Sequence, residues 1–466
     1  LGLQSQTTVQ YAITGKQMSM QVVHHDGNSN VETLAVEGNV RIVEKIPLEN
    51  TANNAIIEIT GEEITVWNPS SPETQILILG KQQDAVFQGR GVELRAKEIN
   101  IARSSNKIWV PGVGRLIANT NSESARQYFQ ANPTPTTQPA NKTLNPLTPL
   151  SPLKTANSAK DNRLLVEWNE SMIFNGKVLQ FLGKPDKNGN RVRAIHLDKE
   201  IWCDVMEIHL NRLVLFFEDK SNIKPEAEMI QCANNVFIRS RELDESYQLK
   251  SMSSAEFGKL RFYVASNYFV AEGPNDRPGV LSFTNRSSEE GFSASKMGLP
   301  ETIAKGDEGG LRFLSVWFHD HVQGTFLGGQ RNVEIVGRVQ TAYLPVDSWD
   351  DHIGIDNLNL ARKRGYILEC DQLHIVEMPD VNNANLSTME LTALGNASID
   401  SSKFYGKART IKYNQAKTQV TFDGNAKILT FEDGKKSEQT AAELIQYDLT
   451  TKAIRLNQSQ GIRIGQ

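Results

Sequence analysis

Apolar and polar residues alternate with a period of two along much of the chain. The pattern is clear in residues 55–60, in residues 311–318 and around Phe422. Because successive side chains of a strand point to opposite faces, this alternation of β-branched and aromatic residues predicts short β-strands. Only residues 122–130 and 358–364 favour a short helix. We therefore expect a mainly-β chain with helix well under about a fifth of its residues, against the usual third.

A six-residue pattern recurs along the chain. It consists of a small residue, two variable residues, an aliphatic residue, one variable residue and then an aliphatic residue or Tyr. Its copies begin at Gly15, Gly61, Ala96, Cys203, Cys370, Ala408 and Ala442. On a strand, the fourth and sixth positions share one face, so every copy presents two apolar side chains to the same side.

A second pattern, Gly-Asn followed by alternating apolar positions, lies between copies of the first. It begins at Gly38, Gly395 and Gly424, with a looser relative at Gly112. Gly and Asn accept positive φ, so the pair is expected to turn the chain tightly between strands. A unit with one apolar face cannot bury that face alone, and stacked units bury it together. The two patterns therefore predict a stack of β repeats.

The alternation of Ala408-Arg409-Thr410-Ile411-Lys412-Tyr413 with Gly424-Asn425-Ala426-Lys427-Ile428 resembles the OstA-like module of lipopolysaccharide transport proteins, the LptA-like family. The match is clearest over residues 389–466, good over 15–118 and patchy between 163 and 380. The resemblance implies stacked antiparallel strands forming β-jellyroll (β-taco) modules around a hydrophobic groove. It also implies a non-catalytic periplasmic protein that shields the acyl chains of lipopolysaccharide or a similar glycolipid, as part of a bridge between membranes. Other β-jellyroll transport proteins would be partners by end-to-end strand stacking.

The apolar positions of both patterns are the expected groove lining. They are Val40, Ile42, Ile64, Val66, Ile99, Ile101, Met206, Ile208, Leu373, Ile375, Ile399, Ile411, Tyr413, Ile428, Ile445 and Tyr447. A lipid track needs a continuous apolar surface, because each buried methylene contributes about 0.8 kcal/mol. The same residues would equally fill an ordinary sandwich core, and the pattern does not distinguish the two.

Proline and glycine divide the chain into segments. Six of the 17 prolines lie between residues 133 and 152 among Thr, Asn and Ser, which predicts a linker or long loop over residues 127–162. We expect an N-terminal module at 1–126, a middle β region with degenerate repeats and insertion loops at 163–388, and a C-terminal module at 389–466. A polar, Gly-rich stretch at 282–310 is one expected loop. Since the chain begins at Leu1, we expect a leader or N-terminal anchor ahead of it.

Charge and cysteine content exclude several classes. Lys and Arg number 50 against 54 Asp and Glu, too balanced for a nucleic-acid binder that works by bulk charge. No apolar run approaches the roughly 20 residues of a membrane helix. Three cysteines exclude a disulfide-rich scaffold. Cys203 and Cys370 occupy the small position of the repeat, which favours buried side chains over reactive thiols, and a disulfide between Cys203 and Cys232 remains open.

The sequence gives only weak indications of a catalytic or metal-binding site. His319 and His321 share a strand face, and the residues that could supply a further ligand are Asp347, Asp350, Asp351 and His352. A solvated strand and an acidic loop explain them better than a metal. No nucleophile elbow, P-loop or dinucleotide motif is present. We therefore expect no catalytic residue, metal or cofactor. The alternatives are a β-solenoid polysaccharide-degrading enzyme, which would need exposed aromatic residues and clustered carboxylates, and a purely structural or adhesive repeat protein.

Overall fold

The structure is a computed structural model of the chain. It describes residues 10–25, 28–45, 56–69, 71–89, 91–119, 163–185, 189, 191–215, 225–243, 247–286, 310–327, 330–379, 387–402, 404–414, 416–432, 435–448, 451 and 453–464. The expected linker at 127–162 and the helix candidate at 122–130 lie outside these residues.

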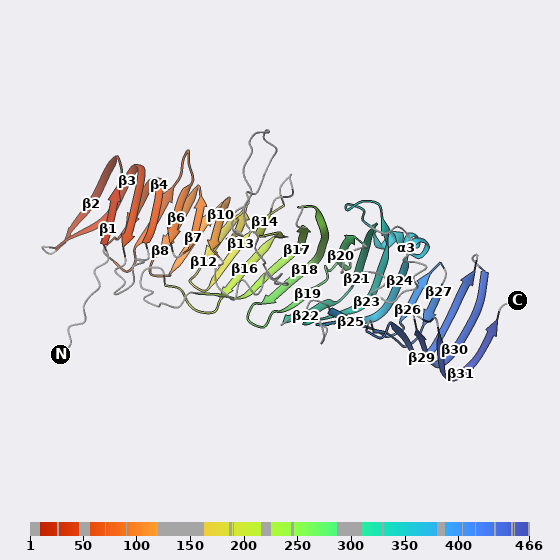
Figure 1. Cartoon of the computed structure of the whole chain (residues 1–466). Coiled ribbons are helices and arrows are strands. Elements are labelled where there is room, and N and C mark those ends of the chain that lie inside the picture. Colours follow the sequence, from red (N-terminus) through yellow and green to blue (C-terminus); the bar gives the residue numbers. More distant parts are fainter. Residues whose placement is uncertain are drawn as a thin grey trace, which may run out of the picture.

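The described strands form one antiparallel sheet of 31 strands. They follow one another along an elongated molecule, with β1 and β31 at opposite ends (Figure 1). The expectation of a mainly-β fold is confirmed. The division into jellyroll modules stays a prediction.

The sheet is folded lengthwise into two layers, which we call layer A and layer B. Layer A contains β1 (Gln10–Thr14), β6 (Ala85–Gly89), β7 (Val92–Ala96), β10 (Gly114–Asn119), β11 (Arg163–Trp168), β14 (Val192–His196), β15 (Lys199–Cys203), β20 (Gly279–Arg286), β21 (Leu311–Phe318), β26 (Ser398–Ser401) and β27 (Phe404–Lys407). Layer B contains β2 (Gln17–His25), β5 (Gln75–Leu79), β8 (Glu98–Ala102), β9 (Lys107–Pro111), β12 (Ser171–Phe174), β13 (Val178–Leu182), β16 (Val205–Leu210), β19 (Tyr268–Glu272), β22 (His321–Leu327), β25 (Ser387–Leu394) and β28 (Thr410–Asn414).

Longer strands run through both layers and join them along one edge, which we call the corner edge. They are β3 (Asn28–Lys45), β4 (Ile56–Trp67), β17 (Ala227–Leu243), β18 (Leu249–Tyr263), β23 (Gln330–Val346), β24 (Tyr366–Pro379), β29 (Gln419–Glu432), β30 (Lys435–Asp448) and β31 (Ile454–Ile464). The sheet therefore contains these long strands beside the short ones that the alternation predicted. The ladder of β3 continues past Gly38 and Asn39 with a shift in register, so the chain changes layer without ending the strand.

The path of the chain repeats along the stack. From β7 in layer A it crosses the corner edge into β8, makes a hairpin at residues 103–106, and returns through β9 to β10 in layer A. The hairpins of both layers lie on the side opposite the corner edge, which we call the far edge. Within the described residues, no strand pairing joins layer A to layer B across the far edge.

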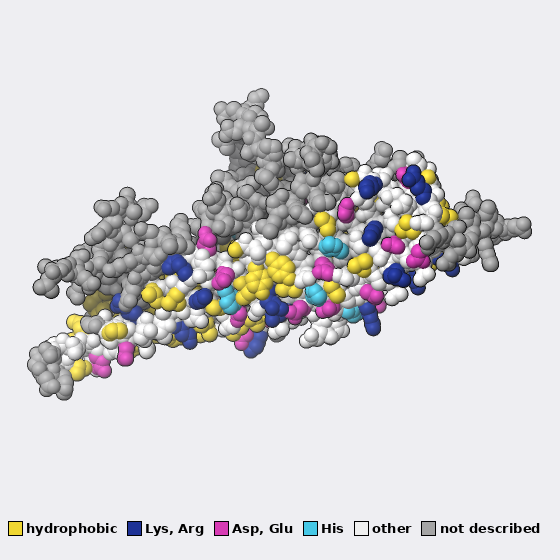
Figure 2. Space-filling view, turned by 90° about the horizontal axis from the view of Figure 1, so that it is seen from below, with side chains coloured by type: hydrophobic (Ala, Val, Ile, Leu, Met, Phe, Trp, Pro, Cys, Tyr) yellow, Lys and Arg dark blue, Asp and Glu magenta, His cyan; other side chains and the backbone are white. Residues whose placement is uncertain are grey.

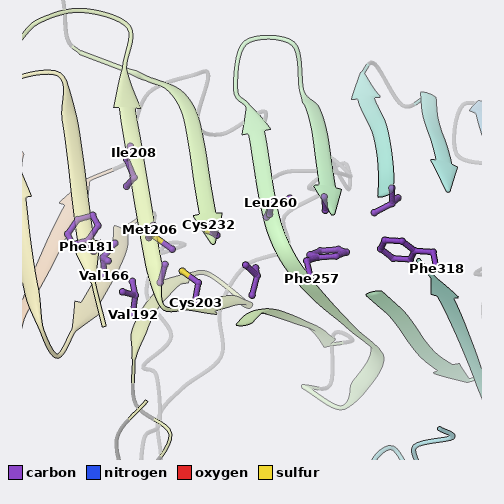
Figure 3. Packing of buried hydrophobic residues seen from close by; sticks show 14 of the residues in the cluster. Val166, Phe181, Val192, Cys203, Met206, Ile208, Cys232, Phe257, Leu260 and Phe318 are labelled. Carbon is purple, nitrogen blue, oxygen red and sulfur yellow. The ribbon is translucent and has the colours of Figure 1, made fainter. Parts of the chain in front are cut away.

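The inner faces of the two layers share one apolar core. It continues from Val36 near the first strands to Ile445 near the last. Figure 3 shows part of it, where Phe181, Met206, Leu260 and Phe318 follow one another between the strands. Burying each such side chain contributes about 1.5–3 kcal/mol, so the stack holds its two layers together mainly through this core.

Strand pairing continues between the segments that flank residues 120–162. β10 pairs with β11, and Gly114 lies opposite Trp168. The expected loop at 282–310 is wrong over its first residues, because β20 extends to Arg286. There Ser282 and Thr284 point outward and alternate with inward Leu281 and Phe283, so their polarity reflects the outer face of a strand.

Helix α3 (Leu358–Arg364) coincides with the predicted helix, which is confirmed. Together with the 3₁₀ turn η1 (Ile355–Asn357), it covers a second apolar cluster on the outer face of layer A. Phe313, Trp317 and Ala361 belong to this cluster. The helix thus explains why residues 311–318 are apolar on both faces. The described part of the chain has no helix with the length and apolar character needed to cross a membrane.

Candidate functional site

Each copy of the six-residue pattern lies where the chain passes from layer A into layer B. Gly61 lies at this point in β4, Ala96 is the last residue of β7, and Cys203 is the last residue of β15. Space explains the small residue: a Cβ on Gly61 would come within 2.8 Å of the Ile78 Cγ2. The following apolar positions then enter layer B with their side chains toward the core.

The Gly-Asn pairs mark the opposite passage, from layer B into layer A. Gly38 and Asn39 have φ of 80° and 54°, and Gly424 and Asn425 have φ of 83° and 53°. In β3 and β29 the pair forms a bulge inside one long strand, where two residues stand unpaired in the ladder. The prediction of positive φ is confirmed, but in these two strands the pair bends the ladder instead of ending it.

Two further passages of this kind escaped sequence analysis. Asn234 and Asn235 have φ of 61° and 52°, and Gly337 and Arg338 have φ of 93° and 47°. Both pairs lie at register shifts in β17 and β23. At Asn234 and Asn235 a signal was available, because Asn tolerates positive φ and the pair lies between two alternating runs, whereas Arg338 carried no such signal.

Passages from layer A to layer B were also missed where a large residue replaces the small one. Trp168 ends β11 and Phe318 ends β21 at the corner edge. Their partners in the ladder are glycines: a Cβ on Gly114 would lie 2.9 Å from Cε2 of Trp168, and one on Gly279 would lie 2.8 Å from Cε2 of Phe318. Large and small residues have exchanged places between neighbouring strands, which explains the patchy repeat in the middle of the chain.

The residues expected to line a groove all point into the space between the layers. Val40, Ile42, Ile64, Val66, Ile99, Ile101, Met206, Ile208, Leu373, Ile399, Ile411, Tyr413, Ile428 and Ile445 are buried, while Ile375 and Tyr447 are partly buried. Lys412, between two of them on β28, is exposed on the outer face. Whether they contact a lipid stays a prediction.

The interior is filled by the protein's own side chains. Ile64, Ile99 and Phe181 are 0% exposed, and the least buried of the lining residues that count as buried reach only 8%. In this form the two layers are closed on each other. Among the described strands, the layers are held together at the far edge by side-chain packing without strand pairing.

Sequence analysis missed several polar side chains inside the stack. Arg312 on β21 is 4% exposed and lies on the same face as Leu314, Val316 and Phe318. Asn285 on β20, opposite Arg312, is 5% exposed. The alternation in residues 311–318 places Arg312 on the same face as the inward residues, so its orientation could have been predicted. The strand is apolar on both faces, however, and the inward face was therefore not evident from the sequence.

Cys203 and Cys370 are buried thiols, as their small positions in the repeat predicted, and Cys232 is buried as well. The structure leaves Cys203, Cys232 and Cys370 free, so Cys203 and Cys232 are not joined. A hydrogen bond with the Cys232 thiol and burial raise the pKa of Cys203, and burial raises the pKa of Cys370 to about 12. A catalytic or metal-binding cysteine needs the opposite shift, toward the thiolate.

The histidine cluster at the corner edge does not assemble a metal site in the structure. The His321 Nδ1 lies 3.2 Å from the Asp320 Oδ1, and His319 is exposed. The Asp351 carboxylate accepts hydrogen bonds from the backbone N–H groups of Asp347 and Ser348 and so holds its own loop. Across the residues with a described position, no three His, Cys, Asp or Glu side chains are grouped closely enough to hold an ion.

The outer surface shows no single-sign patch on the face in view. Figure 2 shows basic and acidic side chains scattered along the length of the molecule instead of gathered by sign. Basic and acidic side chains of the described residues also form ion pairs, such as Arg261 with Glu272 at 2.6 Å. The apolar interior is therefore the most distinctive candidate site. No protein-family model matches the chain, and no curated protein matches it.

Proposed function

We propose that the protein binds and conducts the acyl chains of lipopolysaccharide or a similar glycolipid between its two layers, without catalysing a reaction. The observation that carries the proposal is the continuous apolar interior of a folded sheet whose layers, in the described part of the chain, are joined by strands along one edge only. A conduit of this kind belongs in the periplasm, as part of a bridge between two membranes.

The interior has the character that acyl chains require. Ile99, Ile208 and Ile411 lie far apart in the sequence, and all three are buried on the inner face of layer B. A lipid moving along the stack would meet aliphatic side chains at each strand and would lose little of the roughly 0.8 kcal/mol that each buried methylene contributes.

Entry requires the layers to part at the far edge. In the closed form, the lining side chains occupy the space themselves, and an acyl chain would replace contacts of the same apolar kind. The corner edge would stay intact during this motion, because β3, β17, β23 and β29 carry the ladder through both layers.

The N-terminal end of the stack offers a surface for a partner of the same architecture. Met18 and Met20 on β2 are 54% and 57% exposed, although their ladder partners Val36 and Leu34 lie on the face turned toward the core. Among the described strands, β2 pairs only with β3. A β-jellyroll transport protein stacked on this end would bury both methionines and extend the interior.

The proposal is tested by the lipid that the purified chain retains. The variant Ile411→Asp places a charge in the interior, which costs several kcal/mol unless the carboxyl is neutralised, whereas Lys412→Asp places it on the outer face of the same strand. We expect mass spectrometry to find bound glycolipid with the wild type and Lys412→Asp, and much less with folded Ile411→Asp. Equal retention by both variants would contradict the proposal.

The near-zero exposure of the interior favours a second candidate, a structural or adhesive repeat protein whose interior is only a core. Under this alternative, no lipid is retained by any folded form of the chain.

A further inference from the structure

The interior changes character between the corner edge and the far edge in the C-terminal half of the stack. Toward the corner edge, β21 and β24 contribute Phe318 and Cys370, both buried and apolar. Toward the far edge, the same inner faces carry Arg312 and Tyr366. The cross-section is therefore amphipathic, with an apolar floor and a polar rim.

Arg312 supplies a permanent positive charge at this rim. A guanidinium group is always charged in proteins, and Arg312 is 4% exposed. Asn285 lies opposite it in the ladder with its side chain on the same inner face. A buried guanidinium is stable where anionic or carbonyl oxygens meet it, and its planar fork suits the oxygens of a phosphate.

Three tyrosines surround the same place. Tyr343 stacks on Tyr366 with ring centroids 5.1 Å apart, and Tyr413 approaches from layer B. Burial raises the pKa of Tyr366 well above its ordinary value, the nearby phenols of Tyr343 and Tyr413 raise it further, and Arg312 opposes them. The four side chains come from β21, β23, β24 and β28, which the fold brings together from both layers.

Two hydroxyl groups of this part of the interior are buried without a hydrogen-bond partner among the described residues, one at the tyrosines and one nearer the corner edge. They are the Tyr413 Oη and the Thr341 Oγ1, on residues that are 4% and 2% exposed. Thr341 lies opposite Val316 and Leu368 and so faces the interior. An unsatisfied buried hydroxyl costs about 1–3 kcal/mol, and native proteins rarely retain one without a use.

We propose that this polar rim, formed by Asn285, Arg312, Tyr343, Tyr366 and Tyr413, binds the phosphate-type anionic group of an amphiphile whose acyl chain lies on the apolar floor. The inference rests on the proposed lipid-binding function and deepens it by naming the ligand class. Arg312 pairs with the anionic oxygens, and the Tyr413 hydroxyl donates a hydrogen bond to them, whereas Thr341 lies nearer the apolar floor. The ligand enters when the layers part at the far edge, where this rim lies.

The test compares ligands that share a chain or a head group. Isothermal titration calorimetry on the whole chain uses dodecyl phosphate, dodecyl maltoside and inorganic phosphate, each below its aggregation concentration. We expect dodecyl phosphate to bind about tenfold more tightly than dodecyl maltoside, as one added charge-assisted contact predicts. Inorganic phosphate alone should bind far more weakly, since it leaves the apolar floor empty.

Variants of the polar rim test whether its side chains cause the preference for dodecyl phosphate over dodecyl maltoside. Arg312→Gln should lose the preference for dodecyl phosphate and keep the affinity for dodecyl maltoside. Lys412→Gln, which removes a positive charge from the outer face of β28, should keep both. If Arg312→Gln does not fold, Tyr413→Phe tests the same site, because it removes only a hydroxyl group. This variant should bind dodecyl phosphate several-fold more weakly than the wild type.

Each other outcome counts against the inference. Equal binding of the two amphiphiles by the wild type, or a preference unchanged in folded Arg312→Gln, overturns the rim while leaving a lipid-binding interior in place. Inorganic phosphate that binds as tightly as dodecyl phosphate shows a free-phosphate site and overturns the head-group assignment. If neither amphiphile binds, both the inference and the proposed function fail.

Discussion

Gly114 on β10 lies directly against the indole of Trp168 on β11, its partner in the antiparallel ladder. The indole is 1% exposed, and its Nε1–H donates a hydrogen bond of 3.0 Å to the carbonyl of Gly112. A Cβ on Gly114 would come within 2.9 Å of the indole Cε2. This contact joins the strands that flank residues 120–162.

The first prediction follows from that contact. Gly114→Ala should lower the free energy of unfolding by about 1–3 kcal/mol, because the packed indole has to shift. Gly354→Ala is the matched control, since nothing lies within 4 Å of a Cβ there. Chemical denaturation checks both variants, and equal stabilities would contradict the role given to Gly114.

The second prediction concerns the corner edge. Asn425 has φ of 53°, a conformation that Gly accepts and a β-branched residue does not. Asn425→Val should cost about 1–2 kcal/mol of stability, whereas Asn425→Gly should stay within about 0.5 kcal/mol of the wild type. If Asn425→Val is as stable as Asn425→Gly in thermal denaturation, positive φ does not determine which residue types are tolerated at this position.

The third prediction concerns pH. Burial raises the pKa of Cys370 from its ordinary 9.0 to about 12, so the folded state keeps a proton that the unfolded state releases. The stabilisation is complete below pH 9 and is lost between pH 9 and about 12, at no more than about 1.4 kcal/mol per pH unit. Cys370→Ala should therefore lose stability less steeply in this range. Identical slopes in the two proteins would contradict the burial of this thiol.

The fourth prediction concerns the N-terminal end of the stack. If Met18 and Met20 form a stacking surface, the double variant Met18→Lys, Met20→Lys should abolish concentration-dependent association in analytical ultracentrifugation. The change should leave stability nearly unaffected, since both side chains are more than half exposed. The exposed Val113, at 67%, lies away from this end, and Val113→Lys should leave association unchanged.

Sequence periodicity predicted the strands and the inward residues well because both depend on local alternation. Ile64 and Ile445 needed only the spacing of small and apolar residues to be placed inside. The passages between layers were predicted where a residue type favours positive φ, as at Gly424. They were missed at Arg338, because Arg is not a residue type that favours positive φ.

Features that depend on pairs of distant strands were not predictable in this way. The exchange of size between Gly114 and Trp168 joins residues in different strands, so neither position conforms to the pattern alone. The approach of Tyr413 to Tyr366 likewise depends on the folding of layer A onto layer B. Periodicity assigns a face to each residue, but it does not state which inward residues face each other.

The central claim, that lipid passes through the interior, is tested most directly by photo-crosslinking along the stack. A photoreactive residue is placed singly at the inward positions Ile99, Ile208 and Ile411 and at the outward neighbours Asn100 and Lys412, in cells that make glycolipid. The account predicts glycolipid adducts at all three inward positions and none at the outward ones. Folded protein that captures no glycolipid at any inward position, or captures it equally on both faces, would contradict the account.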